Sequence, residues 1–276
     1  WYVREIEQPA GFVLDDTIYP VTIGADGQVV EIKIVNKYVR GNIHLTKVDS
    51  EYPDNKLTGA TFEVYKDSNA NGRLDNGDEL LGTLTEKEKG EYSMNDLFYG
   101  RYFVKETKAP EGFVLDTGVY EVMIDTNGKT YEVENKAGVG FVNDAMRGNL
   151  KIVKTSSDGK VKGFAFRITG ANGYDIILET NDKGEIFIDE LRIGDYTISE
   201  VSNSASSMYV LPADKKATVK LGSTTIVEMH NVLRDTPKTG DTTNLPLLFT
   251  LAGLSATGIA VTAFIGFKKK KKEGKD

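Results

Sequence analysis

The chain has 276 residues, of which 39% are hydrophobic and 27% are charged, and its formal net charge is -7. Residues 1–267 hold 28 basic and 39 acidic residues, and this acidic balance argues against nucleic acid as a partner. The sequence has no cysteine, which excludes disulfides and thiolate metal sites, so stability outside the cell would need another source.

Short runs rich in Val, Ile, Thr and Tyr, separated by glycine-containing turns, make up the chain before residue 245. Such runs favour β-strands, so we expect an all-β fold. The sequence opens inside a strand pattern with no signal peptide before it. We therefore interpret it as the C-terminal part of a longer protein.

The sequence repeats itself. REIEQPAGFVLDDTIYPVTI near the start matches VKETKAPEGFVLDTGVYEVMI at 104–124, and GNIHLTKVDS at 41–50 matches the beginning of GNLKIVKTSSDGK at 148–160. We predict a truncated repeat (1–37), a complete second repeat (41–136), a complete third repeat (148–232) and a C-terminal segment (233–276). The turn spacing favours a tandem array of antiparallel, immunoglobulin-like β-sandwiches.

Three polar residues recur in phase with the apolar face of their strands. A lysine follows two apolar residues in the first strand, a glutamate follows two in a middle strand, and an asparagine ends the last strand. In the truncated repeat the two apolar residues before the glutamate are Trp1 and Val3, which we expect to point inward. A strand-end residue whose tip reaches water would explain any one of the polar residues. These residues are Lys47, Glu106 and Asn135 in the second repeat, Lys154, Glu200 and Asn231 in the third, and Glu5 and Asn36 in the truncated one.

Burial of this trio has a chemical consequence. It lowers the pKa of the lysine and raises that of the glutamate, which favours a neutral, nucleophilic amine beside a protonated acid. The acid can donate a hydrogen bond to the carboxamide oxygen and relay protons to departing ammonia, leaving a Lys–Asn isopeptide bond. Fixed geometry is worth effective molarities of about 10⁵ to 10⁸ M, so no separate enzyme is required.

The motifs LTKVD, GxYxxxE, APEGF and a strand ending in EN resemble the SpaA-like, or collagen-adhesin B-type, prealbumin-like domains of Gram-positive surface proteins and pilins. The resemblance covers residues 1–232. It implies that Glu106 and Glu200 catalyse one cross-link each, with no other enzymatic activity. The implied bonds join Lys47 to Asn135 and Lys154 to Asn231.

Two departures from the pattern stand out. In the truncated repeat Glu5 and Asn36 match, and the resemblance places the lysine upstream of this chain. The third repeat reads SEVSNSASSMYVLP where APEGF is expected, which leaves its turn geometry open.

The stretch DSNANGRLDNGDE at 67–79 lies between two predicted strands of the second repeat and has the ligand spacing of an EF-hand calcium loop. A solvated acidic turn is the alternative. The chain requires no cofactor elsewhere. The expected calcium ligands are Asp67, Asn69, Asn71, the Arg73 carbonyl, Asp75 and Asp78.

The C-terminus combines TPKTGD at 236–241, an uncharged apolar run at 245–267 and a lysine-rich tail. The run is long enough for one transmembrane helix, with the lysines cytoplasmic. The arrangement resembles an LPXTG-type cell-wall sorting signal, which implies that a sortase cleaves after Thr239 and joins it to peptidoglycan. A permanent membrane anchor is the alternative. The motif residues are Thr236, Pro237, Lys238, Thr239 and Gly240.

These features favour the structural stalk of an extracellular protein anchored covalently to a Gram-positive cell wall, with sortase and peptidoglycan as partners and membrane contact only before processing. The alternative is an adhesin or a minor or basal pilin whose ligand-binding region lies upstream and contacts a host surface. A YPKN-like lysine motif is absent, since the nearest match reads YPVT at 19–22, which lowers the pilus-shaft interpretation.

Overall fold

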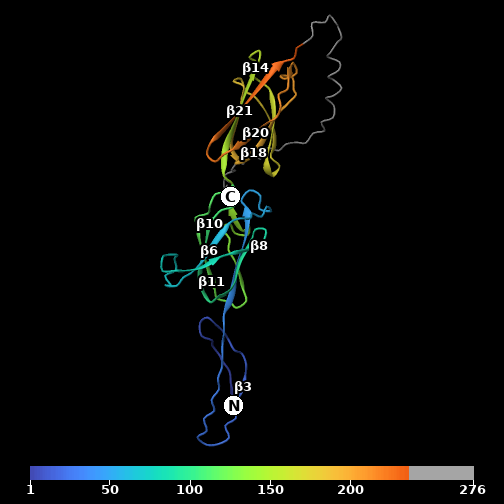
Figure 1. Cartoon of the computed structure of the whole chain (residues 1–276). Helices are drawn as coiled ribbons and strands as arrows, with labels where there is room; N and C mark the ends of the chain where they lie inside the picture. Colours follow the sequence, from blue (N-terminus) through green and yellow to red (C-terminus); the bar gives the residue numbers. More distant parts are fainter. Residues whose placement is uncertain (236–276) are drawn as a thin grey trace, which may run out of the picture. The chain divides into compact units, whose positions relative to one another are not determined.

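The computed structural model describes residues 1–235, and its regular structure is β-strand except for one 3₁₀ turn at Ala171–Gly173 (Figure 1). The predicted all-β architecture is confirmed for this part of the chain. None of its helices is long and apolar enough to cross a membrane. The predicted transmembrane helix (245–267) and the TPKTG motif lie outside the described residues.

The truncated repeat forms two small ribbons. Strand β1 (Tyr2–Val3) pairs with β3 (Tyr19–Pro20), and β2 (Phe12–Val13) pairs with β4 (Lys37–Tyr38). Strand phase predicted that Trp1 and Val3 point inward, and this is wrong, because both are exposed, Trp1 by 82%. In the described residues the ribbons build no closed two-layer core around these side chains.

The second repeat is a sandwich of two sheets. One sheet has the order β11-β10-β6-β7, and the other has β12-β5-β9-β8 with β13 also on β5. Alternate residues of each central strand are buried between the sheets, as the period of two dictates. The strands are β5 (Arg40–Asp49), β6 (Thr61–Lys66), β7 (Glu79–Thr83), β8 (Thr85–Glu88), β9 (Glu91–Phe98), β10 (Gly100–Lys108), β11 (Val119–Ile124), β12 (Thr130–Glu132) and β13 (Phe141–Asn143).

The third repeat is a sandwich of the same kind, with sheets β17-β14-β21-β19 and β16-β15-β18-β20. Its core is made of buried aliphatic and aromatic side chains such as Ile152, Phe166 and Met229. The strands are β14 (Arg147–Ser156), β15 (Ala165–Thr169), β16 (Asp175–Glu179), β17 (Glu185–Arg192), β18 (Gly194–Val201), β19 (Tyr209–Val210), β20 (Lys215–Val219) and β21 (Thr224–Leu233).

The two sandwiches differ in the closing strand. In the third repeat, β21 runs parallel to the first strand, β14, without interruption from Thr224 to Asn231. In the second repeat the corresponding strand is split: β12 and β13 pair with the two halves of β5, and residues 134–140 leave the sheet between them. On the closing strand of the second repeat, the residues that pair with Asn42 and Lys47 are 11 positions apart (130 and 141). The equivalent pairing residues of the third repeat are five positions apart (224 and 229). The second sandwich therefore carries a six-residue insertion and extends to Asn143, past the expected boundary at 136.

Candidate functional site

Each sandwich buries a lysine near the end of its first strand. Lys47 is fully buried, and its Nζ donates a hydrogen bond of 3.1 Å to the Phe141 carbonyl. Lys154 is equally buried, and its Nζ lies 4.0 Å from the ring centre of Phe164. Strand phase predicted both positions inside the core. Across residues 1–235, neither ammonium has a carboxylate within ion-pair distance.

Burial lowers the pKa of both lysines. For Lys47 it brings the pKa down to about 8, although the negative charges of Glu106, Asp116 and Asp49 act in the opposite direction. The pKa of Lys154 is also lowered by burial, against the charges of Glu200 and Asp158. Burial therefore shifts the protonation equilibrium of both side chains towards the neutral amine.

The glutamates are buried on the opposite sheet of each sandwich, on β10 and β18. Burial raises the pKa of Glu106 and of Glu200, and in each case the hydrogen bond from an asparagine side chain opposes this rise. Each acid has one oxygen, Oε1 of Glu106 and Oε2 of Glu200, with no hydrogen-bond partner in the described part of the chain. Such an oxygen is better tolerated when the acid is protonated.

The third repeat brings the predicted trio together. Asn231 is fully buried, and its side-chain amide donates a hydrogen bond of 2.7 Å to Oε1 of Glu200. It lies opposite Ser156 in the parallel pairing, two residues beyond the partner of Lys154. The lysine, acid and carboxamide thus share the space between the two sheets.

In the second repeat the structure corrects the predicted carboxamide. Asn143, not Asn135, lies two residues beyond the partner of Lys47, and its amide donates a hydrogen bond of 2.8 Å to Oε2 of Glu106. Asn143 is buried, whereas Asn135 is half-buried and lies in the inserted segment. The physical reason is the insertion, which carries the chain out of the sheet after Val133 and displaces the closing asparagine along the sequence.

A sequence feature distinguishes Asn143 from Asn135. Asn36 precedes the Arg-Gly-Asn at the start of the next repeat by four residues, in NKYVRGN, and Asn143 does the same in NDAMRGN. The separation between glutamate and asparagine is 31 residues in the other two repeats and 37 for Glu106 and Asn143, which equals 31 plus the six inserted residues. Strand phase alone could not predict that the chain leaves the sheet between β12 and β13.

The truncated repeat retains two members of the trio. The amide of Asn36 donates a hydrogen bond of 2.6 Å to Oε1 of Glu5. The backbone N–H of Asp15 donates to the other oxygen of Glu5 at 2.7 Å. The acid and carboxamide therefore associate here without a buried lysine.

A backbone N–H just after the APEGF turn donates a hydrogen bond to the second carboxyl oxygen of the glutamate. The N–H of Asp116 donates to Glu106 at 2.8 Å, just as Asp15 donates to Glu5. In the third repeat the equivalent residue is Pro212. In both repeats this position lies four residues after a backbone carbonyl that accepts a hydrogen bond from an N–H just after the closing strand. Proline has no N–H, so Glu200 lacks this donor, and the turn indeed differs from the motif.

The predicted calcium ligands gather in one loop. Asp67 accepts hydrogen bonds from the N–H groups of Asn71 and Gly72, and Asp75 accepts from the side chains of Asn69 and Asn71. Asp78 binds the N–H of Asp75. In residues 1–235, no three His, Cys, Asp or Glu side chains are arranged to hold a metal, so calcium binding stays a prediction.

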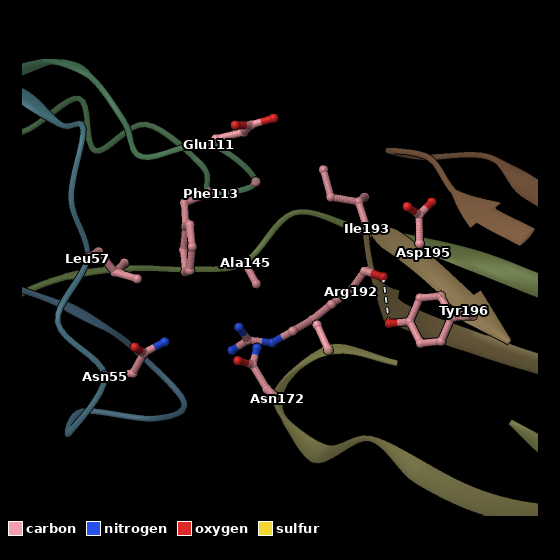
Figure 2. Close-up of a pocket in the computed structure, with 13 residues that line it drawn as sticks. Asn55, Leu57, Glu111, Phe113, Ala145, Asn172, Arg192, Ile193, Asp195 and Tyr196 are labelled. Atoms are coloured by element: carbon pink, nitrogen blue, oxygen red, sulfur yellow. Dashed lines mark hydrogen bonds between the residues drawn. The ribbon is translucent and has the colours of Figure 1, made fainter. Parts of the chain in front are cut away.

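Another candidate region is a cavity of about 210 Å³ around Arg192, at the end of β17 (Figure 2). Figure 2 shows Phe113 and Leu57 on one wall and Tyr196, whose hydroxyl donates to the Arg192 carbonyl, on the other. The Arg192 guanidinium donates to both oxygens of the buried Asp49 at 2.7 Å. Because Asp49 already neutralises the charge of Arg192, we interpret the cavity as the surroundings of a structural ion pair and not as a ligand site.

Comparison with known proteins adds family evidence to this geometry. The chain is 29% identical over 194 residues to the trypsin-resistant surface T6 protein of Streptococcus pyogenes serotype M6, covering 69% of this chain and 32% of that protein. The solved structure of the Bacillus anthracis TIE protein matches with a TM-score of 0.63 and 26% identity, covering 84% of this chain and 41% of that one. The chain thus spans less than half the length of these relatives.

The model of the SpaA prealbumin-like fold domain matches twice, at residues 41–137 and 148–232. The two matches fall on the two sandwiches, and together they cover well over half of the chain. The chain therefore belongs to the family of SpaA prealbumin-like fold domains.

Proposed function

We propose that the two complete repeats are stalk modules of a Gram-positive surface protein, each closed by a Lys–Asn isopeptide bond. One observation carries the proposal: in each sandwich a buried lysine, a buried glutamate and a buried asparagine lie within one core, with the amide already hydrogen-bonded to the acid. The bonds join Lys47 to Asn143 and Lys154 to Asn231. Charged groups are rarely buried without a partner or a function, which favours a chemical role.

The reaction exchanges one amide for another. The neutral lysine Nζ attacks Cγ of the asparagine, the Nζ–Cγ bond forms, and the Cγ–Nδ2 bond breaks. One proton passes from the lysine nitrogen to Nδ2 through the glutamic acid, and ammonia leaves. The acid also stabilises the charge that develops on the carboxamide oxygen by donating a hydrogen bond to it.

The bond would carry load through the module. The first and last strands of each sandwich are parallel neighbours, β5 with β13 and β14 with β21. A covalent link between them lets tension bypass the hydrogen bonds of the sheet. A stalk needs this property, and without cysteines the chain has no disulfide to supply it.

The test is the intact mass of the purified chain, followed by peptide mapping. We expect the mass to be lower than the sequence value by two ammonia molecules, with cross-linked peptides that join Lys47 to Asn143 and Lys154 to Asn231. An unshifted mass would refute the proposal. A cross-link to Asn135 would refute the assignment within the second repeat.

We further propose that a sortase anchors the protein to peptidoglycan through the TPKTG motif. The proposal rests on the order of motif, apolar run and lysine tail in residues 236–276, and on the similarity to a streptococcal surface protein. Deletion of the host's sortase genes should move the protein from the cell-wall fraction to the membrane fraction. Recovery in the membrane fraction of wild-type cells would instead indicate a permanent membrane anchor.

A further inference from the structure

In the second repeat the closing strand β13 needs further contacts to fix its position, whereas the continuous closing strand of the third repeat does not. Strand β13 has only three residues and follows the six-residue insertion, whereas β21 is a continuous ten-residue strand. A short strand has few ladder hydrogen bonds to fix its position. Asn143 is the last residue of β13, so its approach to Glu106 depends on whatever holds this strand.

The side chain of Asn135 fixes the position of β13. Its Nδ2 donates to the Val142 carbonyl at 2.8 Å, and its Oδ1 accepts from the Val142 N–H at 2.6 Å. A carboxamide has the same donor and acceptor as a peptide unit, so Asn135 takes the place of a neighbouring strand. Val142 is the residue immediately before the reacting Asn143.

Asp116 connects this clamp to the acid. Its carboxylate accepts from Nδ2 of Asn135 at 2.7 Å and from the Tyr120 hydroxyl at 2.9 Å. Its backbone N–H donates to Glu106 at 2.8 Å. One residue therefore fixes the inserted segment on one side and the acid on the other.

We propose that Asn135 and Asp116 are positioning residues for isopeptide formation in the second repeat, in which Asn135 holds β13 and Asp116 ties it to Glu106 so that Asn143 meets Lys47. The third repeat has an uninterrupted closing strand and Pro212 in place of Asp116, and it does not use this device. It is therefore an internal control within every molecule. The inference rests on the proposed isopeptide chemistry.

The first experiment measures the rate of bond formation in the full chain, recovered unfolded and unreacted, refolded by dilution and quenched at intervals. Mass spectrometry of proteolytic fragments reports the two cross-links separately. Asn135→Ala should slow the Lys47–Asn143 bond by about 10- to 100-fold, the size of effect expected when a reacting group is misplaced by about 1 Å. The Lys154–Asn231 bond should form at its usual rate, and Asn143→Ala should abolish only the second-repeat bond.

The outcomes separate this inference from the proposed function. Equal rates for Asn135→Ala and the wild-type chain would overturn the inference and leave the isopeptide bonds intact. Loss of the bond in Asn135→Ala with a bond still formed in Asn143→Ala would also overturn it, because Asn135 would then be the cross-linked residue. A wild-type second repeat that never releases ammonia would overturn both.

A second variant distinguishes positioning from a general loss of folding. The carboxylates of Glu106 and Asp49 also face Lys47, and the Asp116 charge raises the pKa of both Lys47 and Glu106. Asp116→Asn keeps the shape of the side chain and removes the charge. We expect its pH–rate profile for the second-repeat bond to move as a whole to lower pH, with a lower maximum rate. A profile that keeps its midpoints would refute the role of Asp116, since a purely structural defect would not shift them.

Discussion

The side-chain amide of Asn231 donates a hydrogen bond of 2.7 Å to the carboxyl group of Glu200, and the two residues stand 31 positions apart on different sheets of the third sandwich. Asn36 and Glu5 form the same bond over the same separation in the truncated repeat. The carboxamide thus associates with the acid whether or not a buried lysine accompanies it. The fold therefore holds the acid and the amide together independently of the lysine.

Asn231→Ala should remove the third-repeat bond and lower the stability of that sandwich. The bond closes a loop of 77 residues (231 minus 154), which restricts the unfolded chain by about 4 to 5 kcal/mol if the entropy model for disulfides applies. Differential scanning calorimetry should show one transition at a markedly lower temperature. Asn36→Ala is the matched control and should leave both complete repeats unchanged. Equal transition temperatures for Asn231→Ala and wild type would contradict a covalent closure.

Glu200→Gln should fold but leave the third repeat uncross-linked, because glutamine cannot relay the proton from the lysine to the departing nitrogen. The second repeat of the same molecule retains Glu106, so the chain should lose one ammonia in place of two. Intact-mass measurement distinguishes the two cases. Glu5→Gln, in a repeat without a buried lysine, should still lose two. Full cross-linking in Glu200→Gln would show that the acid is dispensable.

The rate of bond formation in the second repeat should depend on pH as a bell. The reaction needs a neutral Lys47 and a protonated Glu106, which together carry one proton. Above the Lys47 pKa of about 8 the pair loses its last proton, so the rate falls as pH rises. Below the Glu106 pKa, which burial raises above its usual value, both groups are protonated and the amine is not a nucleophile. Timed refolding at a series of pH values tests this, and a rate still increasing at strongly alkaline pH would contradict it.

Calcium should stabilise the second repeat through the loop at 67–79. Binding to the folded state alone adds about 2.7 kcal/mol when the free ion exceeds its dissociation constant a hundredfold, so the thermal transition of this sandwich should rise. Asp78→Asn should weaken the effect, and Asp67→Ala should remove it, because Asp67 supplies the first ligand of the predicted set. The third repeat lacks the loop and is the control. A transition temperature that calcium leaves unchanged would favour a solvated turn.

The sequence by itself determined the repeats, the all-β fold and the inward face of each strand. A period of two fixes which side of a sheet a residue faces, and this placed Lys47, Lys154, Glu106 and Glu200 in the cores where the structure finds them. The same argument failed for Trp1, because facing inward buries a side chain only where a second layer covers it.

The tertiary structure, and not strand phase, decided which asparagine meets Glu106. Phase along Tyr131, Val133 and Asn135 is continuous in the sequence, but the chain leaves the sheet after Val133 and returns at Phe141. Strand phase predicts which face of a sheet a residue points to, but not which residue of another strand it lies beside. That neighbour is set by pairing with a strand nearly a hundred positions earlier in the sequence. The pairing of β13 with β5 therefore gave Asn143 its place in the core and left Asn135 to hold the strand that carries it.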